Sequence, residues 1–377
     1  MIPRGQIDFQ WSDLFAGLLF PPQSTLPAQQ FITLSVRSGF ELLLSELQFP
    51  PGSQVLCSPL TIPGMLHILE AHQLQPIPVD LELSSLRVSL EQLKQALTPE
   101  CKAVLITPLF GTRQHLLEIS QWCTANNLLL IEDAAQGFSD TWKESDADVT
   151  LYSFGMIKTA TAFGGGLILC KHNSLMDRLR SRQQLLPVQS TASYIKRILT
   201  GVILKICCSR ILYPLLYRLT ISAGVSMDQF LRRWTAGFSA SELLPAIRHR
   251  PCRLLKRMVK HRLSLPLSSR LQQKEAAVKQ MQQLAAHWKW IGQQADQHVH
   301  WIIPVLVEDP QSAIELLAQC GIDATQKGSQ LILIPPPQHK PATLLQASEI
   351  QTQAIYIPVI KPSLLQKVLA ISPDLSQ

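Results

Sequence analysis

Leu130-Ile131-Glu132-Asp133-Ala134-Ala135-Gln136 has the pattern of a buried strand that ends in two acidic residues, followed by two alanines and a glutamine. Further along, Leu151-Tyr152-Ser153-Phe154-Gly155-Met156-Ile157-Lys158 is a second apolar run that leads to a lysine, and Gly164-Gly165-Gly166 follows it. Short apolar runs of this kind are typical of parallel sheets, whose strands are buried on both faces. The stretch therefore predicts a carboxylate and an amine near the ends of two strands, with small residues around them.

An acid at the end of a buried strand and a lysine further along the chain are the parts needed to hold pyridoxal phosphate. Lys158 would form a Schiff base with the cofactor aldehyde, and the Asp133 carboxylate would keep the pyridine nitrogen protonated, so that the ring accepts electrons. Both residues also have ordinary explanations, Lys158 as a surface lysine and Asp133 as a cap on the turn at Ala134-Ala135. The apolar strand before Lys158 and the glycines after it favour the cofactor site.

The length and composition indicate a globular protein of two domains. The chain has 377 residues, of which 46% are hydrophobic and 16% charged, so general disorder is excluded. The eight cysteines form no CxxC pair, and the N-terminus lacks the apolar core of a secretory leader. We therefore expect reduced core thiols in a cytoplasmic protein. No His/Cys/carboxylate cluster has the spacing of metal ligands, so no metal is expected.

Strands alternate with helices from about residue 35 to residue 170. This order favours an α/β fold with a mostly parallel central sheet that is flanked by helices on both faces, and ligands bind such sheets beyond the carboxyl ends of the strands. The expected strands are Gln54–Ser58, Pro76–Val79, Ala103–Thr107, Leu128–Glu132, Val149–Ser153 and Gly166–Cys170. The expected helices are Thr61–His72, Ser89–Ala96 and Leu116–Asn126.

A basic, apolar segment interrupts this alternation of strands and helices. Residues 177–262 contain 17 Lys and Arg but three Asp and Glu, a net charge of +14 within a chain of +7. Within it, Tyr194–Val225 has no uncharged run near the roughly 18–20 residues of a spanning helix. All its cations except Lys205 project to one side of a helical wheel, and Pro214 should kink or divide the helix. The segment 194–224 could lie in a membrane interface or pack on the main body or a second subunit.

We therefore predict three parts of the chain. They are a large cofactor-binding domain over 1–184, a helical insertion over 185–262 and a small C-terminal α/β domain over 263–377. The last is expected to hold helices at Gln272–Ile291, Ser312–Cys320 and Ser363–Ala370, and strands at Trp301–Val307, Gln330–Ile334 and Ile355–Val359.

The Glu132-Asp133-Ala134-Ala135-Gln136 segment and the Ser-Phe-x-x-x-Lys pattern of Ser153–Lys158 resemble the DegT/StrS family of pyridoxal-phosphate-dependent sugar aminotransferases. Either motif alone is weak, but their order and separation are fairly specific. The resemblance implies the fold of type I aminotransferases and a homodimer whose sites are shared across the subunit boundary. It covers about residues 35–170 and the C-terminal unit.

The resemblance also implies roles for individual residues. Lys158 would carry the cofactor and later move the proton, and Asp133 would pair with the pyridinium nitrogen. Gln136 would lie beside the exocyclic oxygen of the ring, and Ser153 would contact the phosphate.

Ser38 and Gly39 match the family's phosphate-binding turn. Free N–H groups at the start of the expected helix Phe40–Leu47 would face an anion there, and Arg37 could add charge. Thr61 matches a threonine that the family keeps near the cofactor. Ser-Gly also begins many ordinary helices.

The substrate side departs from the family pattern. Ile62 stands where an aromatic residue often stacks on the ring, and Gly164 replaces a glutamate. The Gly-x-Asn-x-Arg segment that reaches the partner subunit's site has no clean match, although Arg248 and Arg250 stand at about the right place.

The predicted activity is transfer of an amino group, by resemblance from glutamate, to a keto-sugar or related carbonyl compound that could be nucleotide- or lipid-linked. Sugar biosynthesis for a cell-envelope polysaccharide fits this activity, in the cytoplasm or at the inner membrane face. The alternatives are a non-catalytic regulator or scaffold on the same fold, and another cofactor reaction such as that of a lyase or dehydratase. Nucleic-acid binding is not expected, because aliphatic residues interleave the basic ones and no recognition motif is present.

Overall fold

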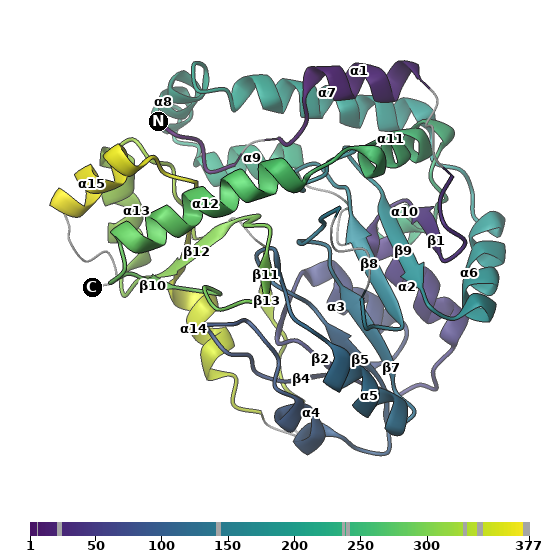
Figure 1. Ribbon diagram of the computed structural model, residues 1–377. Helices are drawn as coiled ribbons and strands as arrows, with labels where there is room; N and C mark the ends of the chain where they lie inside the picture. Colours follow the sequence, from purple (N-terminus) through teal and green to yellow (C-terminus); the bar gives the residue numbers. More distant parts are fainter. Residues whose placement is uncertain are drawn as a thin grey trace.

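The computed structural model describes residues 1–5, 7–20, 25–140, 145–235, 238, 242–326, 330–337 and 342–371. Its centre is a seven-stranded sheet with the order β1-β9-β8-β7-β5-β2-β4 (Figure 1). From β4 to β8 all neighbours are parallel, whereas β9 is antiparallel to both β8 and β1. The strands are β1 (Gln30–Thr33), β2 (Gln54–Cys57), β4 (Gln75–Pro78), β5 (Cys101–Ile106), β7 (Leu129–Asp133), β8 (Val149–Ser153) and β9 (Gly166–Cys170). The predicted mostly parallel sheet is confirmed.

Helices cover both faces of this sheet, and alternate strand residues divide between two cores. Leu105 and Ile131 contribute to the core under α2, α3 and α6, whereas Val104 and Leu130 contribute to the core under α4 and α5. Burial on both faces explains why these strands are continuously apolar in sequence. The helices are α2 (Val36–Leu47), α3 (Pro63–Ala71), α4 (Leu90–Ala96), α5 (Leu117–Ala125) and α6 (Asn173–Leu185).

A smaller antiparallel sheet, β10-β12-β14, forms the C-terminal unit. Two short strand pairs, β6 with β11 and β3 with β13, join it to the large unit. The elements are β3 (Leu60–Thr61), β6 (Thr112–Arg113), β10 (Lys289–Trp290), β11 (Gln297–His298), β12 (Ile303–Leu306), β13 (Ile332–Leu333), β14 (Ala354–Ile357), α12 (Ser268–Leu284), α13 (Pro310–Gln319), α14 (Leu345–Gln353) and α15 (Pro362–Ile371).

The described part of 185–262 is helical, as predicted. Helices α7 and α11 pack with α1 over the part of the sheet that holds β1, β9 and β8 (Figure 1). Helix α7 ends before α8 begins, and Pro214 lies in the first turn of α8. The prediction that the helix is divided near Pro214 is therefore confirmed. The helices are α1 (Trp11–Leu19), α7 (Thr191–Cys207), α8 (Tyr213–Ser222), α9 (Met227–Thr235), α10 (Leu243–Ile247) and α11 (Arg253–Ser264). The three-domain division stays a prediction.

Several predicted boundaries were wrong, and three of them lie in segments that form short strands or lead into them. The helix expected through Ile291 ends at Leu284, because Trp290 pairs with Val305 of β12 and is buried. The helix expected from Thr61 begins at Pro63, because Thr61 is part of β3. The strand expected over 330–334 is limited to β13. In the first two cases strand pairing to a distant segment overrides the local pattern.

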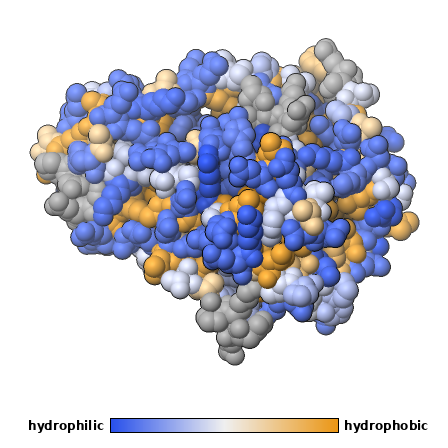
Figure 2. All heavy atoms as spheres, turned by 60° about the horizontal axis from the view of Figure 1, so that its bottom comes forward, coloured by the Kyte–Doolittle hydropathy of each residue, from blue (hydrophilic) through white to orange (hydrophobic). Residues whose placement is uncertain are grey.

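All eight cysteines are free, and six of them are buried, in agreement with core thiols. No helix among the described residues is both long and apolar enough to cross a membrane. Hydrophilic side chains cover much of the face in Figure 2, with apolar residues in small areas between them. Such a mixture is ordinary for a surface in contact with water.

Candidate active site

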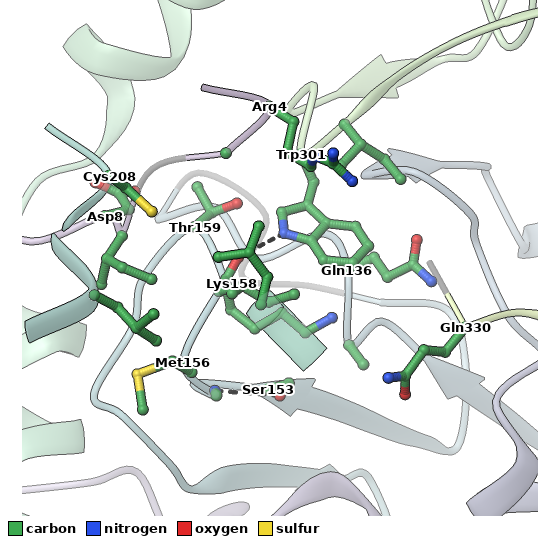
Figure 3. A pocket seen from close by; sticks show the side chains of 18 of the residues that line it. Arg4, Asp8, Gln136, Ser153, Met156, Lys158, Thr159, Cys208, Trp301 and Gln330 are labelled. Atoms are coloured by element: carbon green, nitrogen blue, oxygen red, sulfur yellow. Dashed lines mark hydrogen bonds between the residues drawn. The ribbon is translucent and has the colours of Figure 1, made fainter. Parts of the chain in front are cut away.

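A cavity of about 1680 Å³ lies at the carboxyl ends of β7 and β8. Asp133, Gln136, Ser153 and Lys158 all line it, so the structure brings these four predicted residues together. Figure 3 shows the last three of them. The volume exceeds the roughly 300–1,000 Å³ of a typical small-molecule site. There is room for a cofactor and for a second molecule beside it.

Lys158 lies on the loop between β8 and β9. The loop is held by backbone bonds, with Lys158 N donating to Gly155 O at 3.1 Å and Gly164 N donating to Phe154 O at 3.0 Å. Loss of hydration in the cavity lowers the pKa of Lys158 to about 8, an effect that the Asp133 carboxylate opposes and the Arg37 guanidinium reinforces. An amine with this pKa gains and loses a proton readily near neutral pH.

Asp133 ends β7 and is only 4% exposed. Its burial raises the pKa of the carboxyl group to about 6, while a hydrogen bond from Ala135 N (3.2 Å) and the positive charge of Lys158 act in the opposite direction. The group is therefore mostly ionised at pH 7. A buried carboxylate that stays charged is suited to hold a positive partner in the cavity.

Gln136 and Ser153 are fixed by the backbone around them. Gln136 Oε1 accepts a hydrogen bond from Phe110 N at 2.6 Å, and Ser153 Oγ accepts one from Gly155 N at 3.4 Å. Figure 3 shows both side chains at the cavity, together with Lys158. Their predicted contacts with the cofactor ring and phosphate remain predictions.

Ser38 and Gly39 lie inside α2, which begins at Val36 and not at Phe40 as expected. Ser35 caps the helix: its Oγ accepts from Ser38 N at 3.1 Å and lies 2.9 Å from Ser38 Oγ. A Cβ on Gly39 would lie 3.1 Å from Ile168, so close packing on β9 is enough to explain this glycine. The cavity is lined by the three residues 35–37 that precede Ser38. The role of Ser38 and Gly39 at a phosphate stays a prediction.

Thr61 is buried and pairs with Ile332 across β3 and β13, and it is the next residue, Ile62, that lines the cavity. Its predicted proximity to the cofactor also remains a prediction.

Arg248 and Arg250 are not part of the cavity lining. Arg248 Nη2 pairs with Glu41 Oε1 at 2.7 Å. The backbone of Arg250 bonds to Pro187 and Gln189. These residues were predicted for a site shared with a partner subunit, and that role stays a prediction.

Trp301 is a residue of the site that the sequence did not reveal. Its ring centroid lies 3.8 Å from Lys158 Nζ, and its Nε1 donates to Ile157 O at 2.7 Å. Figure 3 shows the indole beside the Lys158 side chain. The aromatic group therefore comes from the C-terminal unit, whereas Ile62 occupies the position where the family often has one. No local pattern around Trp301 signals this contact.

The chain is similar to known aminotransferases. Residues 30–203 match the model of the DegT/DnrJ/EryC1/StrS aminotransferase family. Over 144 residues the chain is 27% identical to GDP-perosamine synthase of Escherichia coli O157:H7, an alignment that spans 37% of this chain and 40% of that relative. The predicted resemblance to this family is confirmed.

Solved structures show the same fold along nearly the whole chain. The aminotransferase TlmJ of Streptoalloteichus hindustanus superposes with a TM-score of 0.68 at 14% identity, covering 98% of this chain and 97% of its own. The putative sugar aminotransferase Spr1654 of Streptococcus pneumoniae, in its PLP form, gives 0.67 at 14% identity with the same coverage. At such identities the likeness establishes the fold alone, and the predicted fold class is confirmed.

Proposed function

We propose, from the match of residues 30–203 to the DegT/DnrJ/EryC1/StrS aminotransferase family, that this chain is a pyridoxal-phosphate-dependent aminotransferase acting on a sugar carbonyl. The observation that carries the proposal is the pairing of Lys158 and Asp133 in one cavity, where each charge affects the pKa of the other. Such a pair of buried, oppositely charged groups beside a large cavity is typical of an active site.

The residues present fit the proposed cofactor. The Lys158 amine would bind its carbonyl carbon, Asp133 would hold the ring nitrogen and Gln136 would lie beside the ring. Ser153 and the start of α2 are suited to its phosphate, because a hydroxyl and the N-terminus of a helix both favour an anion. When bound, pyridoxal phosphate supplies a ring that accepts electrons from the substrate carbon.

Lys158 and Asp133 would then divide the work of proton transfer. With its pKa near 8, the Lys158 amine can take the proton from the α-carbon of an amino donor and return it at the reacting carbon. Asp133 is mostly ionised above pH 6, so it would keep a proton on the ring nitrogen of a bound cofactor. Trp301 covers one side of the amine and excludes water there.

The donor is proposed to be glutamate and the acceptor a keto-sugar, nucleotide- or lipid-linked, in the synthesis of a cell-envelope polysaccharide. The similarity to a GDP-perosamine synthase supports a sugar acceptor. We further propose a cytoplasmic homodimer, with Arg248 and Arg250 of each subunit turned toward the site of the other. A regulator on the same fold, or a lyase or dehydratase, are the competing functions.

The test is an absorbance spectrum of the purified protein loaded with pyridoxal phosphate and titrated with glutamate. The visible band should bleach as the cofactor takes up the amino group, and one equivalent of 2-oxoglutarate should appear. D-glutamate at the same concentration is the control and should leave the band unchanged. Loaded protein that stays coloured with every natural amino acid would exclude transamination. Release of ammonia or water from a sugar nucleotide would indicate a lyase or dehydratase.

A second proposal is that the enzyme docks on an anionic membrane surface. Exposed apolar side chains gather on α1, α7 and α8, the helices at the top of Figure 1, and we call them the outer face. Those of α7 recur at helical spacing, and α1 and α7 both pack on α11. The members of the outer face are Trp11, Phe15, Leu19, Ile195, Leu199, Ile203, Ile206, Leu215 and Leu219.

Charge favours an anionic lipid surface as the occupant of the outer face. Residues 191–226 contain no Asp or Glu. Lys196, Arg210 and Arg218 are exposed on or next to the same helices. Aliphatic side chains flanked by cations are typical of helices that lie in a membrane interface. The charges differ from the prediction in part, because Arg197 is bonded to Phe163 O at the cavity, and Lys196 and Arg210 also contribute to the cavity lining.

Flotation with vesicles tests the membrane proposal. Wild type should float with phosphatidylglycerol vesicles and much less with phosphatidylcholine, and Leu199→Asp/Ile203→Asp should reduce flotation at least about tenfold, because two apolar side chains lose their burial. Leu117→Asp/Leu345→Asp, two exposed leucines outside the outer face, is the matched control. No flotation of wild type, together with a change of oligomeric mass in the Leu199→Asp/Ile203→Asp variant, would assign the outer face to a second copy of the chain.

A further inference from the structure

Two of the five arginines that line the Lys158 cavity lie in helices that are far apart in sequence. Arg37 lies in the first turn of α2, and Arg197 lies in α7 of the basic insertion. Within the residues that the structure describes, neither forms a salt bridge. Two cations with little access to water and no carboxylate partner are costly, unless an anion joins them.

Neutral contacts hold both guanidinium groups in place. Arg197 Nε donates to Phe163 O at 3.0 Å, which ties it to the glycine loop after Lys158. The Arg37 guanidinium lies 5.0 Å from the ring centroid of Phe238. Its Cδ would lie 2.8 Å from a Cβ on Gly64, so this glycine leaves the room that the Arg37 side chain occupies. Both arginines are therefore positioned, although no charge in the described chain neutralises them.

The glycine triplet brings the two helices together. Gly165 N donates to Leu34 O at 3.0 Å, immediately before α2. A Cβ on Gly166 would lie 2.6 Å from the carbonyl carbon of Ser35, and that contact excludes any larger residue. The loop that carries Lys158 is thus held against the start of α2, and Arg197 is bonded to the same loop.

Electrostatics connects the three cations. Burial lowers the pKa of Arg37, and the positive charge of Arg197 lowers it further. Burial also lowers the pKa of Arg197. Arg37 in turn contributes to the lowered pKa of Lys158. An anion placed between the arginines would relieve this repulsion, and the positive end of the α2 dipole would favour the same charge.

We propose that Arg37 and Arg197 form an anion site for the phosphate group of the cofactor, with the inserted helix α7 supplying one of its two cations. The inference rests on the proposed function, since it assumes that pyridoxal phosphate binds at Lys158. It assigns to α7 a role inside the catalytic unit in addition to its outer face. The phosphate would thus be held in part by the insertion of the same chain. The family's Gly-x-Asn-x-Arg segment, which reaches the site of the partner subunit, has no clean match in this sequence.

Pyridoxal, which lacks the phosphate, provides the decisive comparison. Arg197→Gln should weaken the binding of pyridoxal phosphate about 10- to 100-fold, as expected for loss of a hydrogen bond to a charged group. Its binding of pyridoxal should be unchanged, because Lys158 and Asp133 are intact. Arg37→Gln should behave alike, and Arg197→Lys should keep part of the affinity. Dissociation constants from absorbance titration of the cofactor-free protein measure this.

The controls separate the possible failures. Arg253→Gln removes an exposed arginine away from the cavity and should alter neither constant. Equal weakening of both ligands by Arg197→Gln would indicate a structural role and overturn the inference, as would no weakening of either. If Arg197→Gln leaves the cofactor affinity unchanged but raises the KM for glutamate or the acceptor, the arginines bind an anionic group of a substrate. That result would also overturn the inference. Wild type that binds neither ligand would refute the proposed function itself.

Discussion

Replacing Lys158 with alanine is expected to abolish amino transfer and to remove the visible absorbance of the bound cofactor. The side chain provides both the covalent attachment and the base that moves the proton. General acid–base catalysis alone accounts for about 10²- to 10⁴-fold. Because the attachment is lost as well, the rate should fall by more than about 10³-fold. Product amine assayed at saturating cofactor and glutamate measures the effect.

Lys171→Ala, at an exposed lysine outside the cavity, is the matched control and should keep the wild-type rate. Thermal unfolding should confirm that both variants are folded. A folded Lys158→Ala protein that transaminates at the wild-type rate would refute the assignment of this residue.

The second large effect is expected from Asp133→Asn, which keeps the shape of the side chain and removes its charge. The ring nitrogen would lose the partner that keeps it protonated, so amino transfer should fall by about 10²- to 10³-fold, the cost of removing one electrostatic contact in an active site. In this variant the affinity for the cofactor should also no longer weaken as the pH is lowered. In wild type the carboxylate is protonated as the pH falls through about 6, and binding should weaken there, whereas asparagine has no charge to lose.

Asp177→Asn is the control, because Asp177 has a side chain that is 76% exposed on α6. It should change neither the rate nor the pH profile of binding. If the Asp133→Asn variant keeps the wild-type rate, this carboxylate does not hold the ring. The same follows if its cofactor binding still weakens at acid pH as in wild type.

The parts of the site that could be predicted are those that the chain encodes locally. Asp133 and Ser153 follow apolar strands of a parallel sheet, and parallel strands place their carboxyl ends at one edge. The sequence also predicts a helix beside Ser38 and Gly39, but four residues too late, because its local pattern does not show that Ser35 caps the helix.

Contacts between distant segments could not be predicted in the same way. Trp301 reaches Lys158 because β6–β11 and β3–β13 pair the C-terminal unit with the large one, and neither pairing has a local signal. The helical wheel of 194–224 placed Arg197 with the other cations, since a wheel gives directions around one helix but not which direction is inward. Only the packing of α7 on the glycine loop decides that.

The contact between Trp301 and Lys158 makes the enclosure of that amine depend on how the two units of the molecule are arranged. Trp301 precedes β12 of the C-terminal sheet, yet its ring is hydrogen-bonded to the loop that carries the lysine. Any rigid-body shift of the C-terminal unit that breaks this bond would admit solvent to the amine and raise its affinity for protons toward that of a free lysine. Access of solvent to the base is therefore coupled to the position of the C-terminal unit.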